Sequence, residues 1–282
     1  MSLNPLSPLL YEPLVRTALL EDLGHAGDIT TDAIVPRERR ASLQLRARQH
    51  GVIAGLDVAR CAFQMVSPEV RMETIRGDGS VVAPGDVIAT ISGPARALLT
   101  GERVALNFLC HLSGVATATA QLVVAVKGTR AQIVCTRKTT PGLRALEKYA
   151  VRAGGGGNHR FGLDDAVLIK DNHIAIAGGI TAAITRAKAH AGHLVKIEVE
   201  VDTLAQLEEA LALGVDAVLL DNMTPAELER AVAMTRGRAI TEASGRITVE
   251  TAPAIAATGV DLISVGWITH SSAALDIGLD ET

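Results

Sequence analysis

Aromatic side chains are scarce in this sequence: one Trp, two Tyr and three Phe account for 2% of its 282 residues. Hydrophobic residues still make up 48% of the chain, so its core must be largely aliphatic. A chain of this length forms one large domain or two smaller ones with a sizeable buried core. No stretch has the composition of a disordered linker, and we therefore predict a globular protein.

An excess of positive charge is also missing, because 27 Lys and Arg residues are outnumbered by 31 Asp and Glu residues. The resulting net charge of −4 provides no general attraction to nucleic acids or membrane surfaces. We therefore expect no nucleic-acid partner. Any anion that the protein binds must be held by a local cluster of basic side chains, and the overall balance is compatible with such a cluster.

Features of export and membrane insertion are lacking as well. The cysteines Cys61, Cys110 and Cys135 are odd in number and form no C-x-x-C pair, which favours reduced thiols over a disulfide framework. The first five residues lack the basic and apolar segments of a signal peptide. The longest apolar stretches are interrupted before they reach bilayer-spanning length. We expect a soluble, cytoplasmic protein with no membrane partner.

The first hundred residues mix helical and strand patterns. Apolar residues recur at helical spacing over residues 9–23, and alternate with polar ones over residues 43–47 and 70–74. Residues 57–66 are predicted to form a helix whose N-cap is Asp57. Two turn clusters, residues 77–80 and 83–86, predict antiparallel hairpins. The pattern up to about Leu99 therefore indicates an α+β layer domain.

A long apolar helix is predicted next, from an N-cap at Thr100 to Val126. Beyond it, short buried strands alternate with helical segments such as residues 203–213 and 224–235, which predicts βαβ units and a parallel sheet. Six strands are expected, at residues 132–136, 166–169, 195–199, 217–220, 239–241 and 262–265. Six strands are fewer than a full barrel needs, so we favour an incomplete barrel over a regular one; a doubly wound open sheet is the other arrangement with this pattern.

Polar residues follow the carboxyl ends of these strands, where a parallel sheet gathers its active site. They fall into a basic group from the early strands, an acidic group from the middle strands and glycine turns at the end. The basic group suits a carboxylate or phosphate, the acidic group suits ribose or a developing cation, and glycines allow close backbone approach to phosphate. The basic residues are Arg137, Lys138, His159, Arg160 and Lys170; the acidic ones are Glu200 and Asp221; the turns hold Ser244, Gly245 and Gly266. Together they predict a site for an acidic ring and a phosphorylated sugar.

At these residues the sequence resembles quinolinate phosphoribosyltransferase, also called carboxylating nicotinate-nucleotide pyrophosphorylase. The resemblance covers nearly the whole chain, and its motifs are long and occur in order. The matching segments are residues 21–24, 27–31, 102–107, 113–114, 136–142, 158–160, 170–174, 198–201, 220–223, 242–245, 269–271 and 275–280.

The resemblance implies an α/β fold with an N-terminal sandwich domain over residues 1–114 and an incomplete α/β barrel over residues 115–274. Residues 275–282 are expected to return to the first domain. The resemblance also implies a homodimer with shared active sites, in which Arg103 serves the neighbouring subunit. On the sequence alone, Arg103 is expected in the first turn of the helix that starts near Thr100.

The resemblance further assigns a reaction: quinolinate and phosphoribosyl pyrophosphate give nicotinate mononucleotide, pyrophosphate and carbon dioxide in NAD biosynthesis, with Mg²⁺ accompanying the pyrophosphate. Thr136, Arg137, His159, Arg160 and Lys170 are implied to bind substrate, and Lys138, Glu200 and Asp221 to act in catalysis. The remaining implied substrate-binding residues form two phosphate turns: Ser244, Gly245 and Arg246, and Val265, Gly266 and Trp267. Arg246 stands where glycine is expected more often, and Trp267 where a small residue is common.

Other interpretations remain open. One is a sister phosphoribosyltransferase, for nicotinate or the molybdenum-transport-associated homologue, although the paired basic residues favour a dicarboxylate. The other is a non-catalytic phosphate-sugar binding protein, against which the presence of Lys138, Glu200 and Asp221 together argues. The glycine run at residues 154–157 lacks the strand-then-helix context of a dinucleotide fingerprint and is predicted to be a loop that presents His159 and Arg160. The histidines His25, His111, His173 and His270 show no metal-ligand spacing, so no resident metal is expected.

Overall fold

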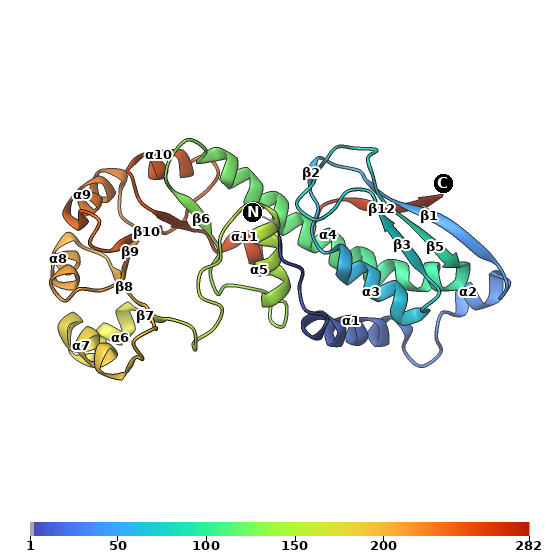
Figure 1. Ribbon diagram of the computed structural model, residues 1–282, viewed down its shortest axis with the longest axis horizontal. Helices are drawn as coiled ribbons and strands as arrows, with labels where there is room; N and C mark the ends of the chain where they lie inside the picture. The colour runs from blue at the N-terminus through green and yellow to red at the C-terminus, as the bar shows by residue number, and fades with distance from the viewer. Residues whose placement is uncertain (1–2, 282) are drawn as a thin grey trace. The chain divides into compact units, whose positions relative to one another are not determined.

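The computed structural model describes residues 3–281 and contains two compact units (Figure 1). The first comprises the chain up to Ala120, the segment Thr140–Gly155 and the chain from Ser271 onward. The second comprises Gln121–Thr139 and Gly156–His270. Two predictions concern the ends of the chain: the lack of signal-peptide features in the first five residues and the return of residues 275–282 to the first domain. Residues 1–2 and 282 lie outside the described residues.

The first unit contains a four-stranded antiparallel sheet in the order β12-β1-β5-β3. These strands are β1 (Arg40–Ala47), β3 (Arg71–Thr74), β5 (Val87–Pro94) and β12 (Ile277–Glu281). A small ladder joins β2 (Gly51–Val52) to β4 (Val81–Val82). Antiparallel pairing was predicted correctly, but β4 pairs with β2 and β3 pairs with β5, so strands consecutive along the chain do not form the simple hairpins expected.

Five helices belong wholly or partly to this unit: α1 (Pro8–Leu23), α2 (Ile29–Ile34), α3 (Leu56–Val66), α4 (Ala95–Ala125) and α5 (Arg144–Ala153). The prediction of α1 over residues 9–23 is confirmed to within one residue. The predicted cap of α3 is wrong. Asp57 lies inside the first turn and pairs with Arg60, whereas the carboxylate of Asp78 accepts the amide hydrogens of Gly55 and Leu56 at 3.0 and 3.2 Å.

The long helix α4 begins five residues earlier than predicted. It starts at Ala95, directly after Pro94, and Thr100 lies within it. The Thr100 hydroxyl donates a 2.9 Å hydrogen bond to Asp28, the residue whose side chain caps α2. Contrary to the sequence-based expectation, α4 is long and apolar enough to cross a membrane by length and composition. Half of its most apolar window, 50%, is buried, as in a core helix of a soluble protein.

The second unit contains a six-stranded sheet in which every pair is parallel, in the order β6-β11-β10-β9-β8-β7. All six predicted strands are present: β6 (Gln132–Val134), β7 (Val167–Ile169), β8 (Ile197–Val201), β9 (Ala217–Asp221), β10 (Ile240–Ser244) and β11 (Leu262–Ser264). Because β6 lies beside β11 and the others follow in chain order, the order is that of a barrel opened between β6 and β7. An incomplete α/β barrel was therefore predicted correctly.

Helices follow the strands of this sheet: α6 (Asp171–Ala177), α7 (Ile180–His190), α8 (Leu204–Ala212), α9 (Pro225–Thr235), α10 (Ala252–Ala257) and α11 (Trp267–His270). In Figure 1, α8, α9 and α10 lie outside the arc of strands. Capping boxes start two of them, Thr203 with Gln206 and Thr224 with Glu227. The core is aliphatic, as predicted, because the fully buried strand residues include Val199, Val218, Leu220 and Ile263.

The gap in the barrel is occupied by the glycine run. Gly157 forms an isolated parallel bridge with Val134 of β6, and its amide donates to the Ile133 carbonyl at 2.8 Å. A Cβ on Gly157 would lie 2.9 Å from Nε2 of Gln132, so the end of that flexible side chain would have to shift to admit it. The run therefore lies against a barrel strand and leads directly into His159 and Arg160, as the loop prediction required.

Candidate active site

The parallel sheet brings nearly all the predicted site residues to one edge. Since its strands run the same way, the residues at their carboxyl ends meet there. Three predicted site residues do not follow a strand: Arg103 lies on α4 in the first unit, and His159 and Arg160 lie in the loop after the glycine run. The residues at the edge are Thr136, Arg137 and Lys138 after β6, Lys170 after β7, Glu200 on β8, Asp221 on β9, Ser244, Gly245 and Arg246 at β10, and Val265, Gly266 and Trp267 after β11.

The ends of β6 and β11 pack closely around Lys138. The Lys138 amide donates to the Thr136 hydroxyl at 3.0 Å, and the Thr269 hydroxyl donates to the Lys138 carbonyl at 2.8 Å. A Cβ on Gly266 would lie 3.0 Å from Cδ of Lys138 and 3.3 Å from the Thr136 hydroxyl. Glycine at this position therefore lets the β11 turn approach the lysine closely.

The next three strand ends carry one cation and two carboxylates: Lys170 after β7, Glu200 on β8 and Asp221 on β9. Lys170 forms an ion pair with Glu200, whose side chain is 12% exposed, whereas that of Lys170 is 46% exposed. Asp221 accepts a 2.6 Å hydrogen bond from the side-chain amide of Asn222, which has a left-handed φ of 53°. Glu200 and Asp221 therefore present carboxylate oxygens at adjacent strand ends, and one of them already has a cation beside it.

The turn after β10 has an unusual backbone. Gly245 has φ 114°, and a Cβ there would lie 2.3 Å from the Asn222 side-chain oxygen, so only glycine fits. Arg246 follows with a left-handed φ of 47°, which explains why glycine was expected at that position. The indole nitrogen of Trp267 donates to the Ile247 carbonyl at 2.8 Å and joins the β11 turn to this one.

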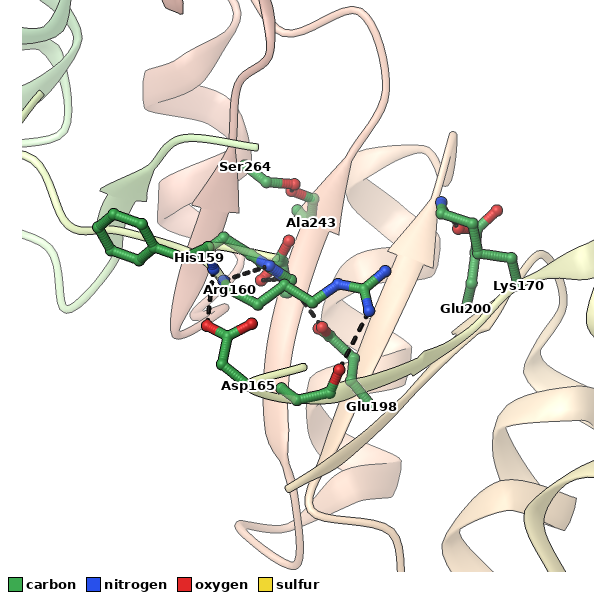
Figure 2. Close-up of polar contacts among 11 residues, drawn as sticks. His159, Arg160, Asp165, Lys170, Glu198, Glu200, Ala243 and Ser264 are labelled. Atoms are coloured by element: carbon green, nitrogen blue, oxygen red, sulfur yellow. Dashed lines mark hydrogen bonds and ion pairs between the residues drawn. The ribbon is translucent and has the colours of Figure 1, made fainter. Parts of the chain in front are cut away.

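Two arginines supply concentrated positive charge beside the gap. Nη1 of Arg160 donates to the Ala166 carbonyl at 3.0 Å (Figure 2). Burial, and then the neighbouring charge of Arg137, lowers the pKa of the Arg160 guanidinium. Within residues 3–281 the buried Nε of Arg160 has no hydrogen-bond partner. Two guanidinium groups close enough for the charge of Arg137 to lower the pKa of Arg160 favour an anion between them.

A deeper layer contains two carboxylates that the sequence analysis did not select. Glu198 lies two residues before Glu200 on β8, and Glu242 lies two residues before Ser244 on β10, so each shares the face of its rim neighbour. Nε2 of His159 lies 2.8 Å from Glu198 and 3.6 Å from Glu242. Burial, and then the charge of Glu198, raises the pKa of Glu242 to about 7. The signals in the sequence were a second glutamate two residues before Glu200 on β8 and a glutamate in the middle of β10.

These three side chains are also the candidates for a metal site, because their donor atoms lie within 4.8 Å of one another. The backbone amide of Arg160 donates to Nδ1 of His159 at 2.8 Å, however. Since Nδ1 accepts a hydrogen, the ring proton of a neutral imidazole is on Nε2, which then has no lone pair for a cation. The observed geometry is therefore that of a hydrogen-bond network.

Arg103 is exposed in the first unit, in the third turn of α4 instead of its first turn. The adjacent Val104 and Asn107 line a cavity of about 220 Å³ together with Glu21, Asp22 and His111. Arg103 precedes Val104 in the sequence but is not one of the residues that line this cavity.

Two protein-family models match the chain. A family model described as "Quinolinate phosphoribosyl transferase, C-terminal domain" matches residues 115–280. A second, "Quinolinate phosphoribosyl transferase, N-terminal domain", matches residues 28–113. The two matches together cover most of the chain, including every residue of the strand-end site.

Individual relatives agree over nearly their full length. The chain is 46% identical over 274 residues to a probable nicotinate-nucleotide pyrophosphorylase [carboxylating] of Bacillus subtilis, covering 97% of this chain and 94% of that one. It is 47% identical over 271 residues to the enzyme of that name from Mycobacterium leprae, covering 94% and 95%. The crystal structure of NadC from Streptococcus pyogenes superposes with a TM-score of 0.95 at 43% identity, covering 98% of each chain. The chain therefore belongs to the quinolinate phosphoribosyltransferase family.

Proposed function

We propose that the protein transfers the phosphoribosyl group of Mg²⁺-bound phosphoribosyl pyrophosphate to quinolinate. The products are nicotinate mononucleotide, pyrophosphate and carbon dioxide, and the reaction serves NAD biosynthesis. The observation that carries this proposal is the rim of the incomplete barrel, where clustered cations, two carboxylates and two glycine turns lie at one edge. The family membership of the whole chain supports it.

The cations of the early strands bind the dicarboxylic acid. Arg137, Arg160 and Lys170 supply more positive charge than one carboxylate can offset, and Arg offers the planar fork that matches a carboxylate. The buried Nε of Arg160 has no partner within residues 3–281, so a carboxylate has a donor available to it. Lys170 is already paired with Glu200, and a bound dianion would compete for its ammonium group.

The carboxylates act on the sugar. As the C1–O bond to pyrophosphate breaks, its electron pair leaves with pyrophosphate and C1 of the ribose becomes cationic. Glu200 and Asp221 at adjacent strand ends stabilise that cation where it forms, which is preferential binding of the transition state. The ring nitrogen of quinolinate then bonds to C1 and becomes a positively charged pyridinium. The Ser244–Gly245–Arg246 and Val265–Gly266–Trp267 turns hold the phosphate groups through backbone amides and the Arg246 charge.

Decarboxylation follows from the product of that step. The C–C bond to the carboxylate next to the pyridinium nitrogen breaks, carbon dioxide leaves, and the electron pair stays on ring carbon beside the positive nitrogen. A proton then completes the ring, and Lys138, packed against the Gly266 turn, is the donor that we assign. The protein orients the dianion and excludes water, and orientation alone contributes roughly 7–11 kcal/mol in well-aligned reactions.

Substrate choice tests the proposal against the sister enzyme that uses nicotinate. Removing one carboxylate leaves partly buried cations without a counter-ion, at a cost of up to about 3–5 kcal/mol. We therefore expect quinolinate to be used between about 10²- and 10⁴-fold more efficiently than nicotinate. Turnover is measured with each acid at equal concentration in the presence of phosphoribosyl pyrophosphate. Comparable efficiencies would contradict the assignment of a dicarboxylate.

We further propose that the protein is a cytoplasmic homodimer in which Arg103 completes the site of the other subunit. Its exposed side chain on α4, within the family-like segment 102–107, supports this role. Arg103→Ala and Lys138→Ala homodimers are each expected to be nearly inactive. After mixed refolding with demonstrated subunit exchange, random pairing makes half of the dimers mixed, and each mixed dimer has one intact site, so about a quarter of wild-type activity returns. Exchange without any recovery would show that Arg103 acts in its own subunit.

A further inference from the structure

His159 has both ring nitrogens committed to its own chain. Nδ1 accepts the amide hydrogen of Arg160 at 2.8 Å, and Nε2 faces the carboxylate of Glu198 at 2.8 Å. The side chains of His159 and Glu198 are only 13% and 11% exposed. Because a backbone amide can only donate, Nδ1 must be unprotonated, and the ring proton is on Nε2, where it donates to Glu198. The backbone therefore fixes a neutral tautomer.

Arg160, the next residue, is held at both ends by this arrangement. Its amide is tied to the His159 ring, and its guanidinium is tied to the Ala166 carbonyl. The loop that follows is closed by Asp165, whose carboxylate accepts the amide hydrogens of Phe161 and Gly162 at 2.7 and 3.0 Å. Figure 2 shows His159, Arg160, Asp165 and Glu198 gathered in this way beside the strands.

We propose that His159 is a positioning residue, held as the neutral Nε2–H tautomer between Glu198 and the Arg160 amide, which orients Arg160 instead of contacting substrate as a cation. This inference rests on the proposed function for the role of Arg160, and it replaces the direct carboxylate contact that the resemblance implied for His159. Glu242, 3.6 Å from Nε2, closes the far side of the network and is 1% exposed.

The charges in the network fit this role. The neutral imidazole has one N–H, on Nε2, and two carboxylates beside it. Glu198 accepts that hydrogen because it lies 2.8 Å from Nε2, whereas Glu242 lies 3.6 Å away. The negative charges of Asp165 and then of Glu198 act on Arg160, so its guanidinium has counter-charges before any substrate arrives, and Asp165 is retained in any Glu198 variant. A second ionised carboxylate at Glu242 would add repulsion without another donor to satisfy it. The network therefore orders the arginine in the unliganded protein.

Nitrogen NMR of the unliganded enzyme tests the tautomer directly. The protein is labelled with ¹⁵N-histidine, and His159 is assigned from the signals lost in His159→Phe. At pH 7 we expect one pyridine-type nitrogen, Nδ1, and one protonated nitrogen, Nε2. His173 is an internal reference, because its Nδ1 accepts the Lys170 amide at 2.9 Å while its ring is exposed. An imidazolium, or a proton on Nδ1, at His159 would overturn the proposal without bearing on the reaction catalysed.

Kinetics of two Glu198 variants separate positioning from charge. Glu198→Gln keeps an oxygen that accepts from Nε2–H, so we expect KM for the dicarboxylic acid within about threefold of wild type. Glu198→Leu keeps the volume but loses the acceptor and frees the ring, and we expect that KM to rise about 10- to 100-fold. KM for phosphoribosyl pyrophosphate should change less than about twofold in both variants. The exposed His190→Asn is the control and should match wild type.

If His159 acted as a cation, both Glu198 variants would remove its counter-charge and would raise KM equally. Equal effects of the two variants would therefore overturn the proposal, and so would a rise in KM for both substrates together. If Glu198→Leu does not fold, the NMR result on the wild-type protein decides by itself. If the enzyme proves to use another acid, the proposed function fails but the NMR result on the His159 tautomer is unchanged. Failure of the proposed function can therefore be told apart from failure of the His159 proposal.

Discussion

The buried carboxyl of Glu242 makes the stability of this protein depend on pH in an unusual direction. Its side chain is 1% exposed, 3.6 Å from His159, and burial followed by the charge of Glu198 raises its pKa from 4.5 to about 7. In the unfolded chain the same group has its ordinary pKa. Between these two values the native state therefore holds a proton that the unfolded state has released.

The sign follows from that difference in bound protons. Stability from Glu242 is fully present below pH 4.5 and is lost as the pH rises through about 7. A shift from 4.5 to about 7 corresponds to at most about 3 kcal/mol. Glu242→Gln has no ionisable group to bury, so its unfolding free energy should increase relative to that of the wild type as pH rises. We expect the difference in unfolding free energy, variant minus wild type, to increase by about 2–3 kcal/mol between pH 5 and pH 8.

Urea unfolding of both proteins at pH 5, 6, 7 and 8 measures this difference. Glu208→Gln, an exposed glutamate on α8, is the matched control and should follow the wild type at every pH. A constant offset between Glu242→Gln and wild type across the range would refute the reasoning, because it would show that Glu242 titrates alike in both states. A difference that decreased as pH rose would contradict the sign.

Two further predictions concern other parts of the chain. Trp267 follows β11 and its indole nitrogen bonds to the Ile247 carbonyl, so its fluorescence should change on titration with phosphoribosyl pyrophosphate or nicotinate mononucleotide; saturation without a spectral change would remove Trp267 from the phosphate turn. Asp78→Ala leaves the amides of Gly55 and Leu56 and the hydroxyl of Tyr149 without their acceptor, and should lower the unfolding free energy by about 2–4 kcal/mol in urea. Asp57→Ala should cost about 0.5 kcal/mol or less, and the opposite ranking would restore Asp57 as the cap of α3.

Local pattern was sufficient for most of the architecture. The six barrel strands are short apolar segments separated by helices, and their parallel pairing follows from that alternation alone. Strand position alone then predicts that the polar residues share one edge, because each of them follows a strand or lies at its carboxyl end. These residues are Lys138, Lys170, Glu200 and Asp221. These predictions succeeded because they depended on neighbours along the chain.

The errors occur where a distant residue decides the outcome. Asp57 is a good N-cap by type, but Asp78, more than twenty residues away, reaches the amides at the start of α3 first. Thr100 has a partner in Asp28 across the first unit, which no local window reveals. The contact of Glu198 and Glu242 with His159 depends on strand order and on the glycine run beside β6, so it required the fold.

The most direct test of the central claim follows each carboxylate of quinolinate separately. The protein is incubated with Mg²⁺, phosphoribosyl pyrophosphate and quinolinate labelled with ¹³C in either the carboxylate beside the ring nitrogen or the other one. We predict labelled carbon dioxide only from the first, in equal amounts with nicotinate mononucleotide, and none when phosphoribosyl pyrophosphate is omitted, because the pyridinium must form before the bond breaks. Label released from the second carboxylate, or carbon dioxide formed without the sugar donor, would contradict the account.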